Sequence, residues 1–211
     1  MQEDSIIEAK QARSQQTQKK LLAALSDSLK TQFFEHISIA HITEQAGVSV
    51  GTFYRRFKNK EALLPYLYQD FSEQFKDWVS ALEENKQGSL NDQIALLVTE
   101  CNAFLHTHAG VLRTLHLNSR LYPEILTKSQ LFERSHDYQQ LAALLMTYST
   151  EISHSKPKIA CEMAIFMLIS NLIEKVLYSE LTPAIASPLS EEENQQELTL
   201  VLQNYLQSPQ A

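Results

Sequence analysis

Apolar positions recur every three or four residues along most of the chain, which is the spacing of amphipathic α-helices. Four glycines, at positions 47, 51, 88 and 110, interrupt this pattern, and strand-like alternation is absent. The pattern therefore predicts an all-α fold of about nine helices. The expected ranges are about 15–34, 39–46, 50–57, 59–85, 89–110, 111–118, 123–150 and 155–180, with a last helix after Ser190.

Two short helices with a glycine between them are expected in the first third of the chain. Ile39, Ile42 and Ala46 repeat at helical spacing and should face a small core. Gly47 can adopt the positive φ that stops a helix abruptly, and Ser49 is placed to cap the next helix. This is the pattern of a helix-turn-helix, in which one helix braces a second that enters the major groove of DNA.

The second of these helices has an inner and an outer face. Phe53 and Phe57 lie four residues apart and should turn inward together. Thr52, Arg55 and Arg56 then remain outside, where two arginines suit a polyanion. The arginines could make bidentate contacts to guanine or reach phosphates, and the residue types leave both roles open.

Residues 15–65 closely resemble the DNA-binding domain of the TetR family of bacterial transcriptional regulators. Beyond residue 65 the resemblance is one of length and helical character. The family resemblance implies a helix-turn-helix DNA-binding domain at 1–60 and a helical ligand-binding and dimerisation domain at 61–211. The residues that match the family pattern I-A-x-x-A-G-V-S-x-G-T-x-Y-x-x-F-x-x-K-E-x-L are Ile42, Ala46, Gly47, Val48, Ser49, Gly51, Thr52, Tyr54, Phe57, Lys60, Glu61 and Leu63.

The resemblance also implies which side chains contact double-stranded DNA. In the family, the positions of Thr52, Tyr54 and Lys60 clamp the phosphate backbone, although Tyr54 could instead be half-buried packing. Many relatives carry a DNA-contacting arginine early in the preceding helix, where this chain has Ala40 and His41. The expected DNA-binding set is Ser49, Thr52, Tyr54, Arg55, Arg56 and Lys60.

Charge is distributed unevenly along the chain. The net charge is −7, but residues 1–60 hold nine Lys/Arg and six Asp/Glu, a balance of +3, which leaves −10 on residues 61–211. A basic N-terminal module on an acidic body would turn one face toward DNA. Near the N-terminus, four basic residues could touch the DNA backbone as a mobile arm or form a solvated charge run: Lys10, Arg13, Lys19 and Lys20.

Composition argues against secretion and against a membrane partner. Met1–Gln18 is polar and does not resemble a signal peptide, and the longest apolar run, Met163–Ile173, is too short to span a bilayer. Cys101 and Cys161 fall within expected helices, where cysteine usually acts as a small buried hydrophobe, although a disulfide remains an alternative. We therefore expect a cytoplasmic protein.

Capping residues and one proline refine the expected helices. Asn59 should cap the helix that runs to about residue 85. Pro65 would then lie about six residues inside that helix, which predicts a kink that could act as a hinge or be fixed. Gly110 should end the helix capped by Ser89, and Ser190 with Glu193 forms a capping box.

The last two helices are the expected dimer surface. The run 163–173 is apolar nearly all round, so it needs cover on two sides, and the last helix offers a leucine stripe. Pairing with a second copy in a four-helix interface is the family's usual arrangement, and a monomer with a central helix is the alternative. The residues expected in the interface of this homodimer are Met163, Met167, Leu168, Leu198, Val201, Leu202 and Tyr205.

The C-terminal body carries aromatic and histidine side chains that could enclose a cavity. In family relatives the space among the fourth to seventh helices holds a small-molecule effector, although each such residue taken singly is more often core. The expected effector-binding set is Phe75, Trp78, Phe104, His108, His116, Phe132 and His136.

Two other functions compete with an effector-released repressor. Glu133-x-x-His136 and Glu151-x-x-His154 resemble the metal pairs of di-iron helical bundles, but one helix would carry both about 27 Å apart. We therefore expect no metal, no cofactor and no enzyme activity. A constitutive or architectural DNA-binding protein without an inducer is the second alternative.

Overall fold

The computed structural model describes the backbone of residues 2–125, 128–181 and 183–208, and their side chains except those of 2–11, 125 and 128–134. These ranges contain nine α-helices, five short 3₁₀-helices and no strand, which confirms the all-α expectation. The chain forms two compact units, Met1–Phe71 with Gly110–Leu126, and Ser72–Ala109 with Thr127–Ala211. The domain boundary expected after residue 60 stays a prediction.

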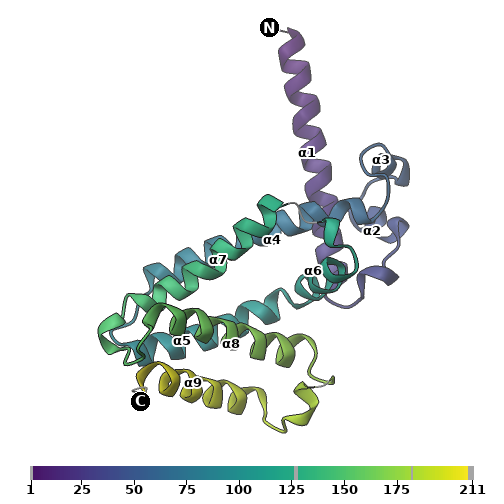
Figure 1. Cartoon of the computed structure of the whole chain (residues 1–211). Coiled ribbons are helices and arrows are strands. Elements are labelled where there is room, and N and C mark those ends of the chain that lie inside the picture. The colour runs from purple at the N-terminus through teal and green to yellow at the C-terminus, as the bar shows by residue number, and fades with distance from the viewer. Residues whose placement is uncertain (1, 126–127, 182, 209–211) are drawn as a thin grey trace. The chain divides into compact units, whose positions relative to one another are not determined.

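The first unit is built on a long N-terminal helix (Figure 1). α1 (Gln2–Leu29) is followed by η1 (Phe34–His36), α2 (Ile39–Gln45), α3 (Val50–Tyr54), η2 (Glu61–Leu63) and the start of α4 (Leu64–Glu84); α6 (Ala109–Leu121) and η3 (Pro123–Ile125) complete it. Its core consists of fully or almost fully buried side chains that include Leu21, Leu25, Leu29, Ile42, Phe53, Leu63 and Leu67.

Local signals fix the turn between α2 and α3. Ser38 caps α2 by accepting a hydrogen bond from the His41 amide, and Ser49 caps α3 by accepting one from the Thr52 amide. Gly47 has φ 64°, a conformation that other residues adopt only with strain. Phe53 and Phe57 are both buried, as their spacing predicts. The helix-turn-helix expectation is therefore confirmed in its core, its caps and its turn.

Backbone contact joins α6 to the end of α1 within the first unit. A Cβ added at Gly110 would lie 2.1 Å from the Leu29 carbonyl oxygen, so glycine alone permits this approach. The Arg113 guanidinium donates to the same carbonyl at 3.3 Å and lies over the Phe33 ring. Tyr68 of α4 donates its hydroxyl to the Leu115 carbonyl at 2.7 Å.

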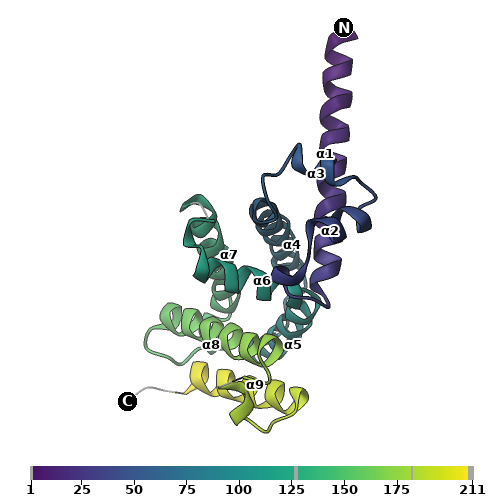
Figure 2. The same cartoon turned by 90° about the vertical axis from the view of Figure 1, so that its right-hand side faces the viewer.

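The second unit layers α8 between α7 and α9 (Figure 2). It contains the rest of α4, α5 (Leu90–Thr107), α7 (Lys128–Met146), η4 (Ser149–Glu151), α8 (Pro157–Leu177), η5 (Ala184–Ala186) and α9 (Glu191–Gln207). α5 packs against α7, α8 and α9. Ile94, Leu97, Leu168, Leu172, Leu202 and Leu206 are almost fully buried in its core.

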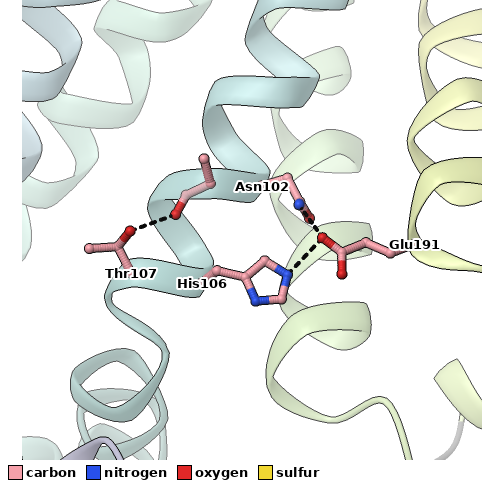
Figure 3. A network of polar contacts seen from close by, with 5 residues as sticks. Asn102, His106, Thr107 and Glu191 are labelled. Atoms are coloured by element: carbon pink, nitrogen blue, oxygen red, sulfur yellow. Dashed lines mark hydrogen bonds and ion pairs between the residues drawn. The ribbon is translucent and has the colours of Figure 1, made fainter.

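A polar cluster ties α9 to α5 (Figure 3). The Asn102 amide and the His106 imidazole both contact one carboxylate oxygen of Glu191, the imidazole Nε2 at 2.8 Å. The Asn102 hydrogen bond is the main reason why the pKa of Glu191 lies below its ordinary value, and His106 lowers this pKa further. Glu191 is the first residue of α9 and lies between Ser190 and Glu193, whose capping box the structure confirms.

Several expected helix boundaries were wrong. α1 begins at Gln2 and ends at Leu29, and α3 ends at Tyr54. Asn59 caps a 3₁₀ turn before α4, so Pro65 is the second residue of α4, where its missing N–H needs no intrahelical acceptor. This position removes the reason for a kink at Pro65. Gly110 belongs to the first turn of α6 and does not end α5.

Within the described residues, no helix combines the length and the apolar character needed to cross a membrane. Cys101 and Cys161 are both buried free thiols.

Candidate nucleic-acid interface

The outward face of α3 carries a chain of hydrogen bonds. The Ser49 hydroxyl lies 2.9 Å from the Thr52 hydroxyl, and the Arg55 guanidinium donates to the Thr52 hydroxyl oxygen at 2.8 Å. Ser49 and Arg55 are exposed and Thr52 is partly exposed. These hydrogen bonds hold the guanidinium of Arg55 against α3. The side chain therefore has less rotamer freedom to lose when it contacts a polyanion.

Tyr54 extends this face with an exposed aromatic side chain. The residue is 57% exposed, and its ring meets the buried Phe53 ring edge to face with centroids 5.5 Å apart. The Tyr54 ring therefore packs on Phe53 while its hydroxyl group is open to solvent. Half-buried packing, the alternative role for Tyr54, does not describe this placement.

Arg56 points toward α1 and does not join the hydrogen bonds of Ser49, Thr52 and Arg55. Its guanidinium Nη1 donates to the Ser14 hydroxyl at 2.6 Å, and its side chain is partly buried. The two residues are 42 positions apart, so no local pattern indicates this contact. Ser14 is therefore part of the interface region although sequence reasoning did not single it out.

Lys60 occupies a pocket of carbonyl oxygens. Its ammonium donates to the carbonyls of Phe34, Glu35 and Ile37 at 2.5, 3.3 and 2.9 Å, and it lies 4.4 Å from the centre of the Phe34 ring. Burial lowers the pKa of Lys60, while the nearby Glu61 and Glu35 carboxylates raise it. An ammonium has three N–H donors, and here each has an acceptor. Lys60 therefore closes the η1 turn in this structure, and the phosphate contact expected of it stays a prediction.

Four of the expected effector residues form one aromatic cluster in the second unit. The Phe104 ring lies 4.8 Å from Trp78, 4.3 Å from His108 and 5.6 Å from Phe75 between centroids, and Tyr138 of α7 joins at Phe75. The indole Nε1 of Trp78 is buried with no hydrogen-bond partner among the described residues. A bound acceptor could satisfy this donor. Sequence reasoning missed Tyr138.

The other expected effector residues do not belong to this cluster. His116 lies on α6 in the first unit, and His136 is exposed on α7. The side chain of Phe132 lies outside the described residues. Buried Asp137, next to His136, instead faces α4 and accepts a long hydrogen bond of 3.5 Å from Ser72.

The expected dimer residues divide into buried and exposed sets. Leu168, Leu198 and Leu202 are buried in the core of the second unit, so they are corrected to core positions that cannot reach a partner. Met163 and Val201 are exposed, whereas Met167 and Tyr205 are partly exposed. The period of the leucine stripe marks the inner face of α9, which sequence reasoning took for the outer one. The exposed apolar residues that it missed are Ile159, Phe166 and Leu200.

The two Glu-x-x-His pairs have separate surroundings. Glu151 of η4 accepts the Leu90 amide at 3.0 Å, at the start of α5, and His154 accepts the Lys156 amide at 3.0 Å. Glu133 lies outside the described side chains. Among the residues that are described, no group of three or more His, Cys, Asp or Glu side chains could hold a metal ion.

Comparison with known proteins agrees with this geometry. Residues 21–67 match the family of bacterial regulatory proteins called the tetR family, a stretch that spans α2, the turn and α3. Among curated proteins, none is significantly similar to the chain in sequence.

Solved structures of regulators share the fold over almost the whole chain. The FadR regulator of Bacillus subtilis, in complex with stearoyl-CoA, is 20% identical with a TM-score of 0.62, over 91% of this chain and 99% of its own. The fatty acid degradation regulator FadR of Bacillus halodurans is 18% identical with a TM-score of 0.60, over 91% and 95%. A tetR-family regulatory protein from Rhodococcus RHA1 is 14% identical with a TM-score of 0.62, over 88% and 95%.

Proposed function

We propose that this chain, whose residues 21–67 match the tetR family of bacterial regulatory proteins, is a cytoplasmic homodimeric repressor that a small-molecule effector releases from a near-palindromic operator. Ser49, Thr52, Tyr54 and Arg55 are the proposed contacts to DNA. Arg56 and Lys60 mainly stabilise the protein around this face, because Arg56 binds Ser14 and Lys60 closes the η1 turn.

The observation that carries this proposal is the outward face of α3. A short capped helix with a buried Phe53 on one side presents two hydroxyls, a phenol and a guanidinium on the other. Hydroxyls and phenols are phosphate donors, and arginine reads guanine or phosphate. Because α3 has only five residues, a docked α3 would place all four side chains close to the duplex.

Release by an effector rests on the aromatic cluster of the second unit. Phe75, Trp78, Phe104, His108 and Tyr138 offer apolar ring surface, and the Trp78 indole offers a buried donor. The FadR structure with stearoyl-CoA is an example of this fold in complex with a ligand that has a long apolar part. An effector that prefers the protomer arrangement unable to bind DNA would weaken operator binding by the same coupling factor.

Dimerisation rests on the apolar side chains that α8 leaves uncovered. Ile159, Met163 and Phe166 follow one another at spacings of four and three residues, so they share one face. Their exposed fractions are 56, 45 and 67%, which is unusual for large apolar side chains that lie together. A second copy that covers this face would pair two α3 helices for the two halves of an operator.

Selection of bound sequences from random duplex DNA tests the function. We expect a twofold-symmetric sequence whose affinity falls with salt by about 0.9 log units per log unit of salt for each phosphate contact. Arg55→Ala should weaken binding, by about 1–3 kcal/mol if the side chain reads guanine. Lys86→Ala, an exposed lysine of the second unit, is the control. The absence of salt-sensitive binding to any duplex would refute the proposal.

Thermal unfolding tests the effector. A ligand that binds the folded state must raise the unfolding midpoint as its concentration rises. Trp78→Phe retains most of the ring surface and removes the indole donor, so it should reduce the shift caused by a ligand that accepts from Nε1. A ligand that raises the midpoint but leaves operator affinity unchanged would refute release as the switch.

A further inference from the structure

The loop of residues 56–60, which follows α3, carries three cations: Arg56, Lys58 and Lys60. The protein itself already binds two of them, because Arg56 donates to the Ser14 hydroxyl and Lys60 donates to three main-chain carbonyls. Lys58 is exposed and makes no hydrogen bond or ion pair with any residue that the structure describes. Of these three cations, Lys58 is therefore the one that is available to an anion outside the protein.

Lys60 would lose its contacts within the protein if it turned toward DNA. Its ammonium lies between the carbonyls of Phe34, Glu35 and Ile37 and 4.4 Å from the centre of the Phe34 ring. A phosphate contact by Lys60 would leave these carbonyls without their charged donor, which costs free energy. A phosphate contact by Lys58 would break no interaction of the described residues, so Lys58 is the more favourable donor.

Anchors on both sides fix the backbone at Lys58. Phe57, before it, is buried, and its amide donates to the Phe53 carbonyl of α3 at 3.0 Å. The Asn59 side chain, after it, accepts the Ala62 amide at 3.1 Å and caps the turn that leads into α4. The main chain at Lys58 is therefore held relative to α3, so binding needs to order only the Lys58 side chain.

The length of α3 brings this loop to the DNA backbone. Five residues at a rise of 1.5 Å make a helix of about 7.5 Å, whereas the major groove is about 12 Å wide. When such a helix lies in the groove, the chain that leaves it passes a wall of the groove within a few residues, and phosphates form that wall. Lys58 lies four residues after Tyr54, the last residue of α3.

We propose that Lys58 makes the phosphate contact that the family resemblance assigns to Lys60, and that Lys60 instead keeps the η1 turn closed. The proposal rests on the DNA-binding function above and adds one phosphate contact per protomer to those on the outward face of α3. Phosphate contacts carry no base information. Lys58 therefore contributes to the affinity and the register of binding, whereas the choice of sequence stays with α3.

The salt dependence of binding to the selected operator is the first test. Lys58→Gln should weaken binding and reduce the salt slope by about 0.9 units for each phosphate contact that is lost. Lys58→Arg keeps the cation and should retain both the affinity and the slope. Lys30→Gln is the matched control, because it removes an exposed lysine of the same unit that is paired with Asp27 at 2.7 Å. It should change neither quantity.

An isosteric variant tests whether the loop lies against the DNA backbone. Asn59→Asp keeps the oxygen that accepts the Ala62 amide, and aspartate caps a helical turn as well as asparagine does. The variant places a negative charge next to Lys58. We therefore expect an unchanged unfolding midpoint together with weaker operator binding.

Single neutral linkages locate the contact. Operator duplexes with one methylphosphonate linkage each, at successive positions of one half-site, remove one phosphate charge at a time. At one position the neutral linkage should weaken binding by the wild-type protein and not by Lys58→Gln, because this variant has already lost the contact. Lys60→Gln, at a temperature where circular dichroism shows it to be folded, should respond to that linkage as the wild-type protein does.

Four results would overturn the proposal: a wild-type salt slope for Lys58→Gln, equal losses for Lys58→Gln and Lys30→Gln, wild-type operator affinity for Asn59→Asp, or a linkage whose effect depends on Lys60 and not on Lys58. In each of these cases the wild-type protein still binds the operator, so the DNA-binding function would stand. A wild-type protein without salt-sensitive affinity for any duplex would end both proposals.

Discussion

The Lys60 ammonium binds three main-chain carbonyls, so its removal should affect stability more than DNA contact. Lys60→Met keeps the aliphatic stem and leaves the carbonyls of Phe34, Glu35 and Ile37 without this donor. Partly buried acceptors that lose a charged partner cost about 1–3 kcal/mol. We expect chemical denaturation to show a loss of this size, with an unchanged salt slope of operator binding at a temperature where the variant is folded.

A neighbouring lysine provides the matched control. Lys58 is exposed, and Lys58→Met should change the free energy of unfolding by no more than about 0.5 kcal/mol. If Lys60→Met kept full stability and reduced the salt slope by about 0.9 units, Lys60 would be a phosphate contact after all.

At the scale of single residues, the sequence identifies turn and cap residues, because their partners lie only a few positions away in the chain. Gly47, Ser49 and Ser190 could be assigned because a turn or a cap involves residues within four positions. The acceptors of Lys60 lie 23–26 positions away, and Ser14 lies 42 positions from Arg56. Such pairs depend on how helices pack, which no periodicity encodes.

At the scale of elements, the approach of α6 to α1 depends on one glycine. Gly110→Ala would place a methyl group 2.1 Å from the Leu29 carbonyl oxygen, and backbone cannot move aside as a flexible side chain can. Overpacking of this kind typically costs about 1–3 kcal/mol. We expect a lower thermal midpoint for Gly110→Ala. Gly88→Ala is the control, because nothing lies within 4 Å of its Cβ position and it should have little effect. Equal midpoints for the two variants would contradict the close contact.

The link between α5 and α9 should weaken in acid. The folded-state pKa of Glu191 lies below the ordinary value of 4.5, so its carboxylate stabilises the fold above that pH, and this contribution is lost as the pH falls through the folded pKa. Glu191→Gln should therefore be less stable than the wild-type protein at neutral pH, with a difference that shrinks below about pH 4.5.

Glu192→Gln removes the same charge from the same turn of α9 and serves as the control in a denaturation series from pH 7 to pH 3. The Glu192 carboxylate accepts a hydrogen bond from Gln196 of the same helix. Its removal should therefore leave the contact between α5 and α9 unchanged. A difference between the wild-type protein and Glu191→Gln that stays constant over the whole series would rule out the proposed role of Glu191.

The periodicity of apolar positions predicts where helices occur, but it does not always predict the residues at which they begin and end. Pro65 was expected deep inside a helix because Asn59 resembles a cap. The cap is real, but it closes a 3₁₀ turn, and α4 starts at Leu64. The start of α1 at Gln2 was missed because the sequence before residue 15 is mostly polar and gives no helical periodicity of apolar positions.

At the scale of the whole molecule, the sequence predicts the helix-turn-helix better than the proposed effector and dimer surfaces. The helix-turn-helix is a local motif whose caps and turn are set by residues within a few positions of one another. The aromatic cluster joins Trp78 of α4 to Phe104 of α5 and Tyr138 of α7, three elements that are distant in the chain. On α8 and α9, apolar residues lie on both faces, and only packing shows that Leu168 is inside and Phe166 outside.

The exposed face of α8 should control both oligomeric state and DNA affinity. Phe166 is 67% exposed, so Phe166→Glu removes no core contact and should leave the fold intact. A buried charge in a twofold interface would appear twice and face its own copy, which opposes association. We expect analytical ultracentrifugation to show a monomer for this variant and a dimer for the wild-type protein. Operator binding should weaken because the two half-sites are then bound independently. Leu121→Glu introduces the same charge at a residue of α6 that is 58% exposed and should leave a dimer. A dimeric Phe166→Glu protein with unchanged operator affinity would show that this face of α8 is not the interface.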